Sequence, residues 1–199
     1  MKKLFLKTQN ETLHNGFLDR FFERCNNKED FVYQAKNYLS DMTIEFYEYV
    51  GEILNRLGFN ALVTREGDVN CRFDATIKDN AYSIPIEIKS PLEVMEINVK
   101  AITQACENKI VLMSRRFFPT TEQTTSLAIG FEYPPSRSDV YELVDDIHAA
   151  YQINIGLIDI STLLKLVYAV EKEGATINKK YFNNLKGVLQ YEKTIIKRA

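Results

Sequence analysis

The sequence predicts an α/β protein with a mixed central sheet and flanking helices. Apolar residues recur at helical spacing in several segments of the 199-residue chain, and short runs rich in β-branched and aromatic residues lie between them. Over residues 41–114 the expected order is helix, three strands, helix and strand. We expect residues 1–199 to form a single domain, with a helical N-terminal extension (1–40), a core (41–114) and an α/β completion (115–199).

The N-terminal part of the chain is expected to be helical. Residues 8–25 and 29–40 carry apolar side chains at helical spacing. Asp41 is suited to cap a third helix that runs to Leu57, because its side chain can accept a hydrogen bond from a free N–H group in the first turn. Gly58 is well placed to end that helix, since glycine readily adopts the left-handed conformation found just after a helix.

Three strands are expected next. The first covers residues 59–65, and the other two, 71–77 and 82–89, form a predicted β-hairpin joined by turn residues at 78–81. Pro85 lies inside the second strand of this hairpin. Because proline has no N–H group to donate to a neighbouring strand, it indicates either an edge strand or a β-bulge.

The rest of the chain alternates between expected helices and strands. A helix begins at Pro91 and continues to about Cys106, since proline is tolerated in a first turn, and a short buried strand follows at 109–114. Residues 115–137 are polar and irregular, apart from a candidate strand at 127–133. The later segments are a helix at 138–151, a strand at 153–160, a helix at 161–173 capped by Ser161 and a last helix capped by Asn178.

The composition excludes several classes of protein. The chain is 45% hydrophobic and 26% charged, as is ordinary for a globular protein, and no apolar run is long enough to cross a membrane. Three scattered cysteines and two histidines predict neither a disulfide framework nor a zinc site. The net charge of −2 does not indicate a nucleic-acid-binding protein, although local basic pairs leave that function open. We expect a cytoplasmic protein.

The predicted hairpin carries the residues with the clearest chemical meaning. Side chains alternate across a strand, so Glu87 and Lys89 share the face opposite to the isoleucine side chains of residues 84–88. If the turn is centred at 80–81, Asp74 lies almost directly across from Glu87. Two carboxylates can hold a hard divalent cation, and a nearby lysine can orient or activate a water molecule. The alternative is a solvated charge pair beside an unrelated aspartate.

This arrangement resembles the PD-(D/E)XK nuclease superfamily. The similar features are an acidic residue on a helix, a hairpin with Asp74 and the triplet Glu87-Ile88-Lys89, and then a helix and a strand. The resemblance covers residues 41–114 and implies a restriction-endonuclease-like αβββαβ core. It implies that Asp74, Glu87 and the main-chain carbonyl of Ile88 are metal ligands and that Lys89 is the catalytic lysine.

Helices on either side of the hairpin contribute further residues in this superfamily. The helix before the hairpin usually supplies an acidic residue to the metal site and to catalysis. Glu48 is the preferred candidate because it lies about three turns before the end of the predicted helix. Glu45 and Glu52 lie on a similar face and remain alternatives. On the helix after the hairpin, Gln104 is expected to touch DNA or a catalytic water, as a glutamine does in some relatives.

The resemblance implies a Mg²⁺-dependent endonuclease, with Mn²⁺ able to substitute, that cuts double-stranded DNA to 5′-phosphate and 3′-hydroxyl ends. Cutting both strands then requires a homodimer or a partner subunit. Arg115 and Arg116 are candidate nucleic-acid contacts or, alternatively, solubilising charges. A faint similarity of residues 155–161 to the cleavage subunits of type IIS restriction enzymes favours a restriction-type cleavage domain or subunit. The alternatives are a repair or transposition nuclease, RNA as the substrate, and a non-catalytic DNA-binding or assembly module.

Overall fold

A six-stranded mixed sheet organises the part of the chain that the computed structural model describes, residues 16–64, 73–79 and 81–196. In spatial order its strands are β1 (Ala61–Val63), β2 (Ala75–Lys78), β3 (Ser83–Ile88), β4 (Ser126–Gly130), β5 (Ile155–Asp159) and β7 (Gly187–Val188). The pairs β1–β2 and β2–β3 are antiparallel, whereas β3, β4, β5 and β7 pair in parallel. The short strands β6 (Thr176–Ile177) and β8 (Ile195–Ile196) pair with each other.

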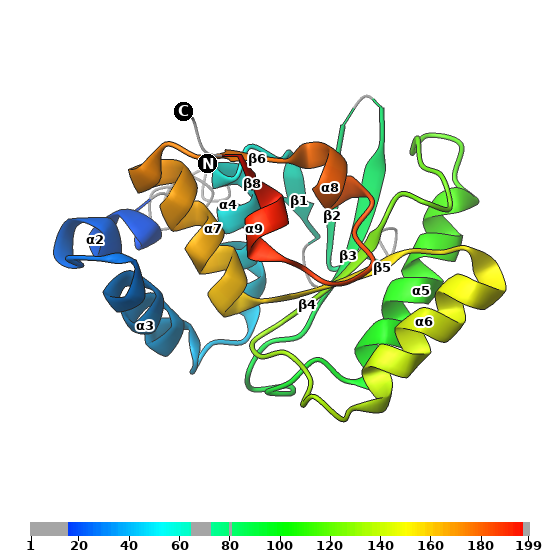
Figure 1. The fold of residues 1–199 in the computed structure, drawn as a ribbon, viewed down its shortest axis with the longest axis horizontal. Helices are drawn as coiled ribbons and strands as arrows, with labels where there is room; N and C mark the ends of the chain where they lie inside the picture. Colours follow the sequence, from blue (N-terminus) through cyan, green and yellow to red (C-terminus); the bar gives the residue numbers. More distant parts are fainter. Residues whose placement is uncertain (1–15, 65–72, 80, 197–199) are drawn as a thin grey trace, which may run out of the picture.

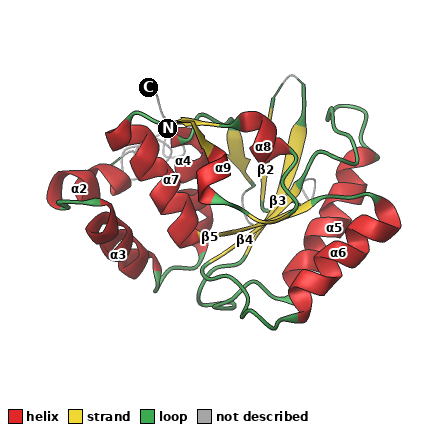
Figure 2. Ribbon diagram, in the orientation of Figure 1, coloured by secondary structure: helices red, strands yellow, loops and turns green. Residues whose placement is uncertain are grey.

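Helices cover both faces of the sheet (Figure 1; Figure 2). One face is covered by α4 (Ile44–Arg56) and α7 (Ile160–Glu173), while α3 (Lys28–Leu39) packs on the outer side of α7 and α2 (Phe17–Arg24) packs on α3; all four helices share one apolar core with the sheet. The other face is covered by α5 (Val99–Met113) and α6 (Asp139–Tyr151), which build a second core. Two short helices, α8 (Lys179–Asn183) and α9 (Tyr191–Thr194), lie in the C-terminal segment. The predicted α/β class with a mixed sheet is therefore confirmed.

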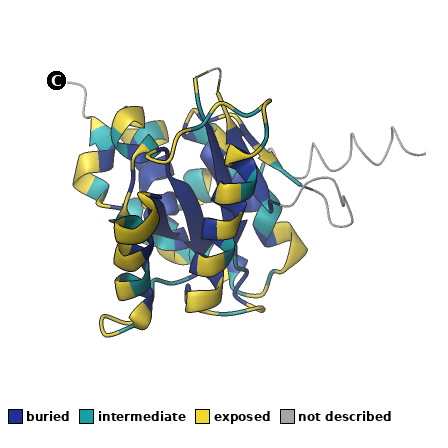
Figure 3. Cartoon of the chain, turned by 90° about the vertical axis from the view of Figure 1, so that its right-hand side faces the viewer, coloured by how far each residue is buried: buried dark blue, intermediate teal, exposed yellow. Residues whose placement is uncertain are grey.

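The strand β3 lies between these two layers, and all six of its residues are buried. Figure 3 shows the buried strands enclosed by helices whose outer surfaces are exposed. Ile84, Ile86 and Ile88 have no exposed surface and belong to the core under α4 and α7. The alternation expected from the sequence is confirmed, and it leaves Glu87 on the face that α5 covers.

The ends of two helices differ in part from the expectation. Gly58 follows α4 with a φ of +82°, a left-handed conformation that glycine adopts without strain, as predicted. The start of α4 was expected at Asp41, but the residue before the helix is Thr43. Asp159, at the end of β5, caps α7 by accepting a hydrogen bond from the N–H of Thr162, so Ser161 is already inside the helix.

The expected strand at 109–114 is wrong. These residues continue α5, which begins at Val99 rather than at Pro91 and is capped by the side chain of Asn98. A short apolar run is ambiguous between a strand and a buried helix segment, and here Leu112 is buried while Ile110 is 52% exposed, which fits a helix with one apolar side. The helix–three strands–helix–strand order still holds for α4, β1, β2, β3, α5 and β4, because the candidate strand expected at 127–133 is present as β4 and takes the last place.

The expectation that Pro85 marks an edge or a bulge is also wrong. Pro85 faces Thr76 in a regular register with β2, and β4 flanks β3 on its other side. Lys89 donates its N–H to the carbonyl of Ile129 in β4, so by alternation the nitrogen of Pro85 also faces β4. The parallel pairing begins only at Ile86, so the missing N–H group lies just outside that ladder.

The C-terminal segment is less helical than expected. Asn178 caps α8 as predicted, but this helix ends at Asn183, and the chain returns to the sheet at β7. Gly187, with a φ of +72°, lies in that return. The expectations for residues 8–15, for residue 65 at the end of the first strand, for 71–72 at the start of the hairpin and for residue 80 in its turn lie outside the described residues.

Candidate active site

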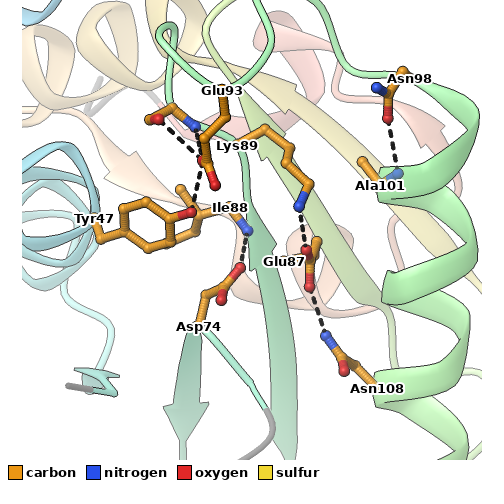
Figure 4. Close-up of polar contacts among 10 residues, drawn as sticks. Tyr47, Asp74, Glu87, Ile88, Lys89, Glu93, Asn98, Ala101 and Asn108 are labelled. Carbon is orange, nitrogen blue, oxygen red and sulfur yellow. Dashed lines mark hydrogen bonds and ion pairs between the residues drawn. The ribbon is translucent and has the colours of Figure 1, made fainter. Parts of the chain in front are cut away.

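The side chain of Asp74 ends the pairing between β2 and β3. The register pairs Ala75 with Ile86, which brings Asp74 opposite Glu87 at the next position, as the sequence predicted. Beyond that point the Oδ2 atom of Asp74 accepts a hydrogen bond of 2.8 Å from the N–H of Ile88 (Figure 4). A carboxylate thus takes the place of a main-chain carbonyl, which holds Asp74 at the edge of the hairpin.

Glu87 points toward α5 and is held there by two partners (Figure 4). Its Oε1 atom forms an ion pair of 2.8 Å with Nζ of Lys89, and its Oε2 atom accepts a hydrogen bond of 3.0 Å from the side-chain amide of Asn108. Only 6% of the Glu87 side chain and 13% of the Lys89 side chain are exposed. A buried carboxylate needs such partners, because an unpaired charge away from water is strongly unfavourable.

The two carboxylates affect each other electrostatically. Burial, together with the nearby charge of Glu87, raises the pKa of Asp74 to about 6, although the N–H of Ile88 and the ammonium of Lys89 favour its ionised form. Acidic pairs whose pKa values are perturbed by burial and by a like charge are typical of functional sites, although ion-pair networks with a structural role also produce them.

The helix α4 reaches the site through Tyr47. The hydroxyl of Tyr47 donates a hydrogen bond of 2.7 Å to Oε2 of Glu93, which also accepts hydrogen bonds from the N–H and the hydroxyl of Ser90. Partial burial raises the pKa of Glu93, but these hydrogen bonds outweigh it and the pKa lies below its ordinary value. Burial and the bond to Glu93 raise the pKa of Tyr47. This network fixes the chain just after Lys89 against α4.

The three acidic candidates on α4 lie on different parts of the helix. Glu48 is half-buried, one turn before Gly51, and the main chain of Gly51 packs directly against Val63 in β1. The next residue in the chain, Thr64, donates its N–H to the carbonyl of Asp74 at 2.9 Å. Glu48 therefore lies at the same end of the sheet as Asp74, where the sequence predicted an acidic residue.

Glu45 and Glu52 are placed less favourably. Glu45 is exposed in the first turn of α4. Glu52 lies 3.3 Å from Nε of Arg56, without hydrogen-bond geometry, and Arg56 in turn binds Asp19 of α2 and approaches Glu171 of α7. Burial raises the pKa of Glu52 to about 7, although Arg56 opposes the shift. The surroundings of Glu52 are thus α2 and α7, not the hairpin.

Of the expected nucleic-acid residues, Gln104 lies on the same side of α5 as Asn108, and Arg115 and Arg116 follow the end of this helix. Gln104 is four residues before Asn108, and its buried Oε1 atom has no hydrogen-bond partner among the described residues. Arg115 lies two residues beyond the last residue of α5, over the ring of Phe73 and 5.3 Å from its centroid. Arg116 is exposed. The structure therefore places Gln104 on the side of α5 that contacts Glu87, and Arg115 beyond the end of that helix.

Sequence reasoning missed Asn108, Tyr47 and Glu93. Asn108 has a signal that could have found it, because it lies one helical turn after Gln104 in the same segment. No signal in the sequence could have found Tyr47 and Glu93, since their contact depends on how α4 packs beside the turn after β3.

The oxygen atoms at this edge fit a hard divalent cation. The N–H and C=O groups of one residue in an extended strand point to the same side, so the carbonyl of Ile88 faces Asp74 as its N–H does. Carboxylate and carbonyl oxygens are the ligands that Mg²⁺ prefers, and a cation would relieve the repulsion between Asp74 and Glu87. No group of three or more His, Cys, Asp or Glu side chains among the described residues is arranged to hold a metal ion. Main-chain oxygen and water would have to complete the shell.

Comparison with protein-family models, with curated proteins and with solved structures found no match for this chain. No helix in the described ranges combines the length and the apolar composition that crossing a membrane requires.

Proposed function

We propose that this protein is a Mg²⁺-dependent endonuclease with a restriction-endonuclease-like core and with Asp74, Glu87 and Lys89 at its active site. One observation supports it most strongly. The two carboxylates lie on facing residues of the β2–β3 hairpin, and Lys89 pairs with Glu87 at 2.8 Å. Flanking helices before and after the hairpin supply the further residues expected from the resemblance, Glu48 and Gln104.

The residues of the site have distinct roles in this proposal. Asp74, Glu87 and the carbonyl of Ile88 would hold Mg²⁺, or Mn²⁺ in its place, and Glu48 is the candidate for an additional ligand and catalytic carboxylate. The bound ion supplies neutralisation of the phosphodiester charge and a lowered pKa for an attacking water. Lys89 donates to that water or to the developing negative charge, and Asn108 holds Glu87 in position. The products are 5′-phosphate and 3′-hydroxyl ends.

The proposed substrate is double-stranded DNA, with Gln104, Arg115 and Arg116 as contacts to it. Because one such site cuts one strand, we propose that a homodimer or a partner subunit completes a double-strand cut. A restriction-type cleavage domain or subunit is the preferred class, a repair or transposition nuclease is the alternative, and the cytoplasm is the proposed compartment.

A non-catalytic DNA-binding or assembly module is the second candidate, and one observation favours it. Both oxygens of Glu87 already have protein partners, Lys89 and Asn108, so the carboxylate is satisfied without a cation. In that case Asp74 and Glu87 stabilise the hairpin and its contact with α5 and bind no metal.

The test is cleavage of supercoiled plasmid with Mg²⁺, with Mn²⁺ and with EDTA. We expect the wild type to cut only with a metal ion, and we expect Asp74→Asn and Lys89→Gln to lose at least about 100-fold in rate, as removal of a group that stabilises the transition state does. Nicking without linearisation indicates a missing partner. Products with 3′-phosphate ends contradict the mechanism.

Asp79→Asn is the matched control, because Asp79 is an exposed aspartate at the turn of the same hairpin. It should cut like the wild type. Asp74→Asn keeps an oxygen for the N–H of Ile88 and removes the repulsion with Glu87, so it should melt no lower than the wild type without metal. If wild type and Asp74→Asn bind Mg²⁺ equally weakly by calorimetry and neither cuts, the non-catalytic module is the correct function.

A further inference from the structure

Phe117 is the most exposed large apolar side chain in the described part of the chain. It is 93% exposed, whereas the next, Tyr33, is 67% exposed. Phe117 lies in the loop between α5 and β4, in the sequence Arg115-Arg116-Phe117-Phe118. Transfer of an exposed aromatic ring from water into contact with a binding partner is favourable.

The loop holds Phe117 at the corner of a tight turn. The N–H of Phe118 donates a hydrogen bond of 3.3 Å to the carbonyl of Arg115, which makes Arg116 and Phe117 the two central residues of a β-turn. Side chains at these two positions point outward, and both are exposed.

Contacts on both sides of the turn fix it against the hairpin. Arg115 lies over the ring of Phe73, 5.3 Å from its centroid, and Nζ of Lys78 lies 4.9 Å from the ring centroid of Phe118. Phe73 lies two residues before β2, and Lys78 is the last residue of that strand. The turn is therefore supported along the strand that follows Asp74.

The turn is on the same face of the sheet as the two carboxylates. Ala75 and Ile77 of β2 belong to the core under α4, so by alternation Asp74 and Lys78 face the α5 side. On α5, Asn108 binds Glu87, and Arg115 follows two residues after the last residue of this helix, Met113. A polymer crossing Asp74 and Glu87 can reach the turn without leaving this face.

The chemistry of the turn suits one class of ligand. Arg115, Arg116 and Lys78 attract a polyanion, and an exposed ring between them offers a surface for stacking. A nucleic acid supplies both phosphates and flat π faces, and aromatic side chains with basic neighbours are how proteins hold single strands. In an intact duplex the bases already stack on each other, so a ring can enter only by unstacking them.

We propose that Phe117 stacks on an unpaired base of the nucleic-acid substrate while Arg116 binds an adjacent phosphate. This inference rests on the proposed nuclease function and narrows its substrate to DNA with a single-stranded or locally unpaired stretch next to the cut.

The test is binding of a fluorescein-labelled DNA single strand by the full chain in EDTA, followed by fluorescence anisotropy over a range of salt concentrations. Phe117→Ala should weaken binding roughly tenfold without changing the salt dependence, because stacking involves no counterion release, and Phe117→Trp should restore it. Arg116→Ala should instead lower the slope of log K against log salt by about 0.7, the value for one phosphate contact on a single strand. A fully paired duplex should show a smaller effect of Phe117→Ala.

Tyr33→Ala is the matched control, since Tyr33 is an exposed aromatic residue on α3. Unchanged affinity of Phe117→Ala, or an equal loss in Tyr33→Ala, overturns the proposal. The proposal is also overturned if the wild type is an oligomer that dissociates in Phe117→Ala while the affinity for DNA stays the same, because Phe117 then contacts another protein chain.

If Phe117→Ala weakens binding but the wild type never cuts DNA, only the nuclease function fails. If the wild type cuts and Phe117→Ala binds normally, only the stacking role fails.

Discussion

Lys109 is a fully buried lysine on α5 that the proposed chemistry does not use. It has no exposed surface, and its Nζ donates a hydrogen bond of 2.6 Å to the hydroxyl of Thr120 in the loop that also carries Phe117. Burial lowers the pKa of Lys109 to about 8, although the charge of Glu122 opposes the shift. Burial of Lys109 therefore lowers the stability of the fold, while its hydrogen bond to Thr120 holds the loop after α5 against that helix.

Replacing Lys109 with methionine should stabilise the protein at neutral pH. The folded state disfavours the charged form of Lys109, which lowers the free energy of unfolding. This loss of stability is complete below about pH 8 and disappears as the pH rises toward about 10.4, the pKa of lysine in the unfolded chain. We expect Lys109→Met to raise the free energy of unfolding by about 1 kcal/mol at pH 7, after loss of the bond to Thr120, and to show no gain near pH 10. Urea denaturation at both pH values measures this. Lys165→Met, at an exposed site on α7, is the control, and a gain that does not change with pH would contradict the explanation.

At the scale of elements, the packing of α4 against β1 sets the position of Glu48. The side chain of Asn55 bridges to the strand, since it donates to the carbonyl of Ala61 and accepts from its N–H. One turn earlier, Gly51 allows the helix to touch Val63, because a Cβ atom at this position would lie 2.4 Å from Cγ2 of that valine. This close approach keeps the N-terminal half of α4 beside Asp74.

Gly51→Ala should therefore destabilise the protein even though alanine favours helix. The helix preference contributes about 1 kcal/mol in favour of alanine, but overpacking against a stiff β-branched side chain costs about 1–3 kcal/mol. We expect urea denaturation to show a net loss of about 1 kcal/mol in the free energy of unfolding. We also expect the rate of plasmid cleavage to fall by more than the fraction of unfolded protein explains. Val63→Ala in the same chain should recover the stability, because it removes the clashing methyl groups. Additive effects of the two substitutions would exclude this contact as the cause.

At the scale of the whole molecule, the C-terminal segment closes the sheet and returns to α4. The strand β7 pairs with β5, and the ring of Phe182 lies 4.4 Å from that of Phe59, which follows α4. Lys179 donates a hydrogen bond of 2.7 Å to the carbonyl of Gly58. Segments more than 120 residues apart thus meet at the end of α4.

Phe182→Ala should destabilise the whole described chain, not only its C-terminal segment. Phe182 has no exposed surface, and truncation of a buried phenylalanine costs about 3–5 kcal/mol. We expect a lower melting temperature with circular dichroism and tyrosine fluorescence still changing together in one transition. Phe117→Ala, at the exposed ring, is the control and should leave the transition in place. An early, separate transition in Phe182→Ala would show that the C-terminal segment folds independently.

Periodicity and turn chemistry in the sequence were enough to predict the α/β class, the β2–β3 hairpin and most helices. The same local rules placed Asp74 opposite Glu87, since the register of a short hairpin follows from where its turn lies. They failed for residues 109–114, where a short apolar run fits a helix and a strand equally well, and for Pro85, whose neighbours in the sheet are distant in the sequence. For the acidic residue on α4, the local rules favoured Glu48 but left Glu45 and Glu52 as alternatives.

The amino-acid sequence by itself determined which residues could carry the chemistry, because strand alternation is a property of the local chain and sets Glu87 apart from the isoleucines. Only the tertiary structure decided what surrounds them. Asn108 holds Glu87, Tyr47 holds Glu93, and the turn with Phe117 lies on the same face of the sheet as Asp74. The physical reason is that these contacts join segments far apart in the chain, and their geometry follows from how whole helices pack on the sheet.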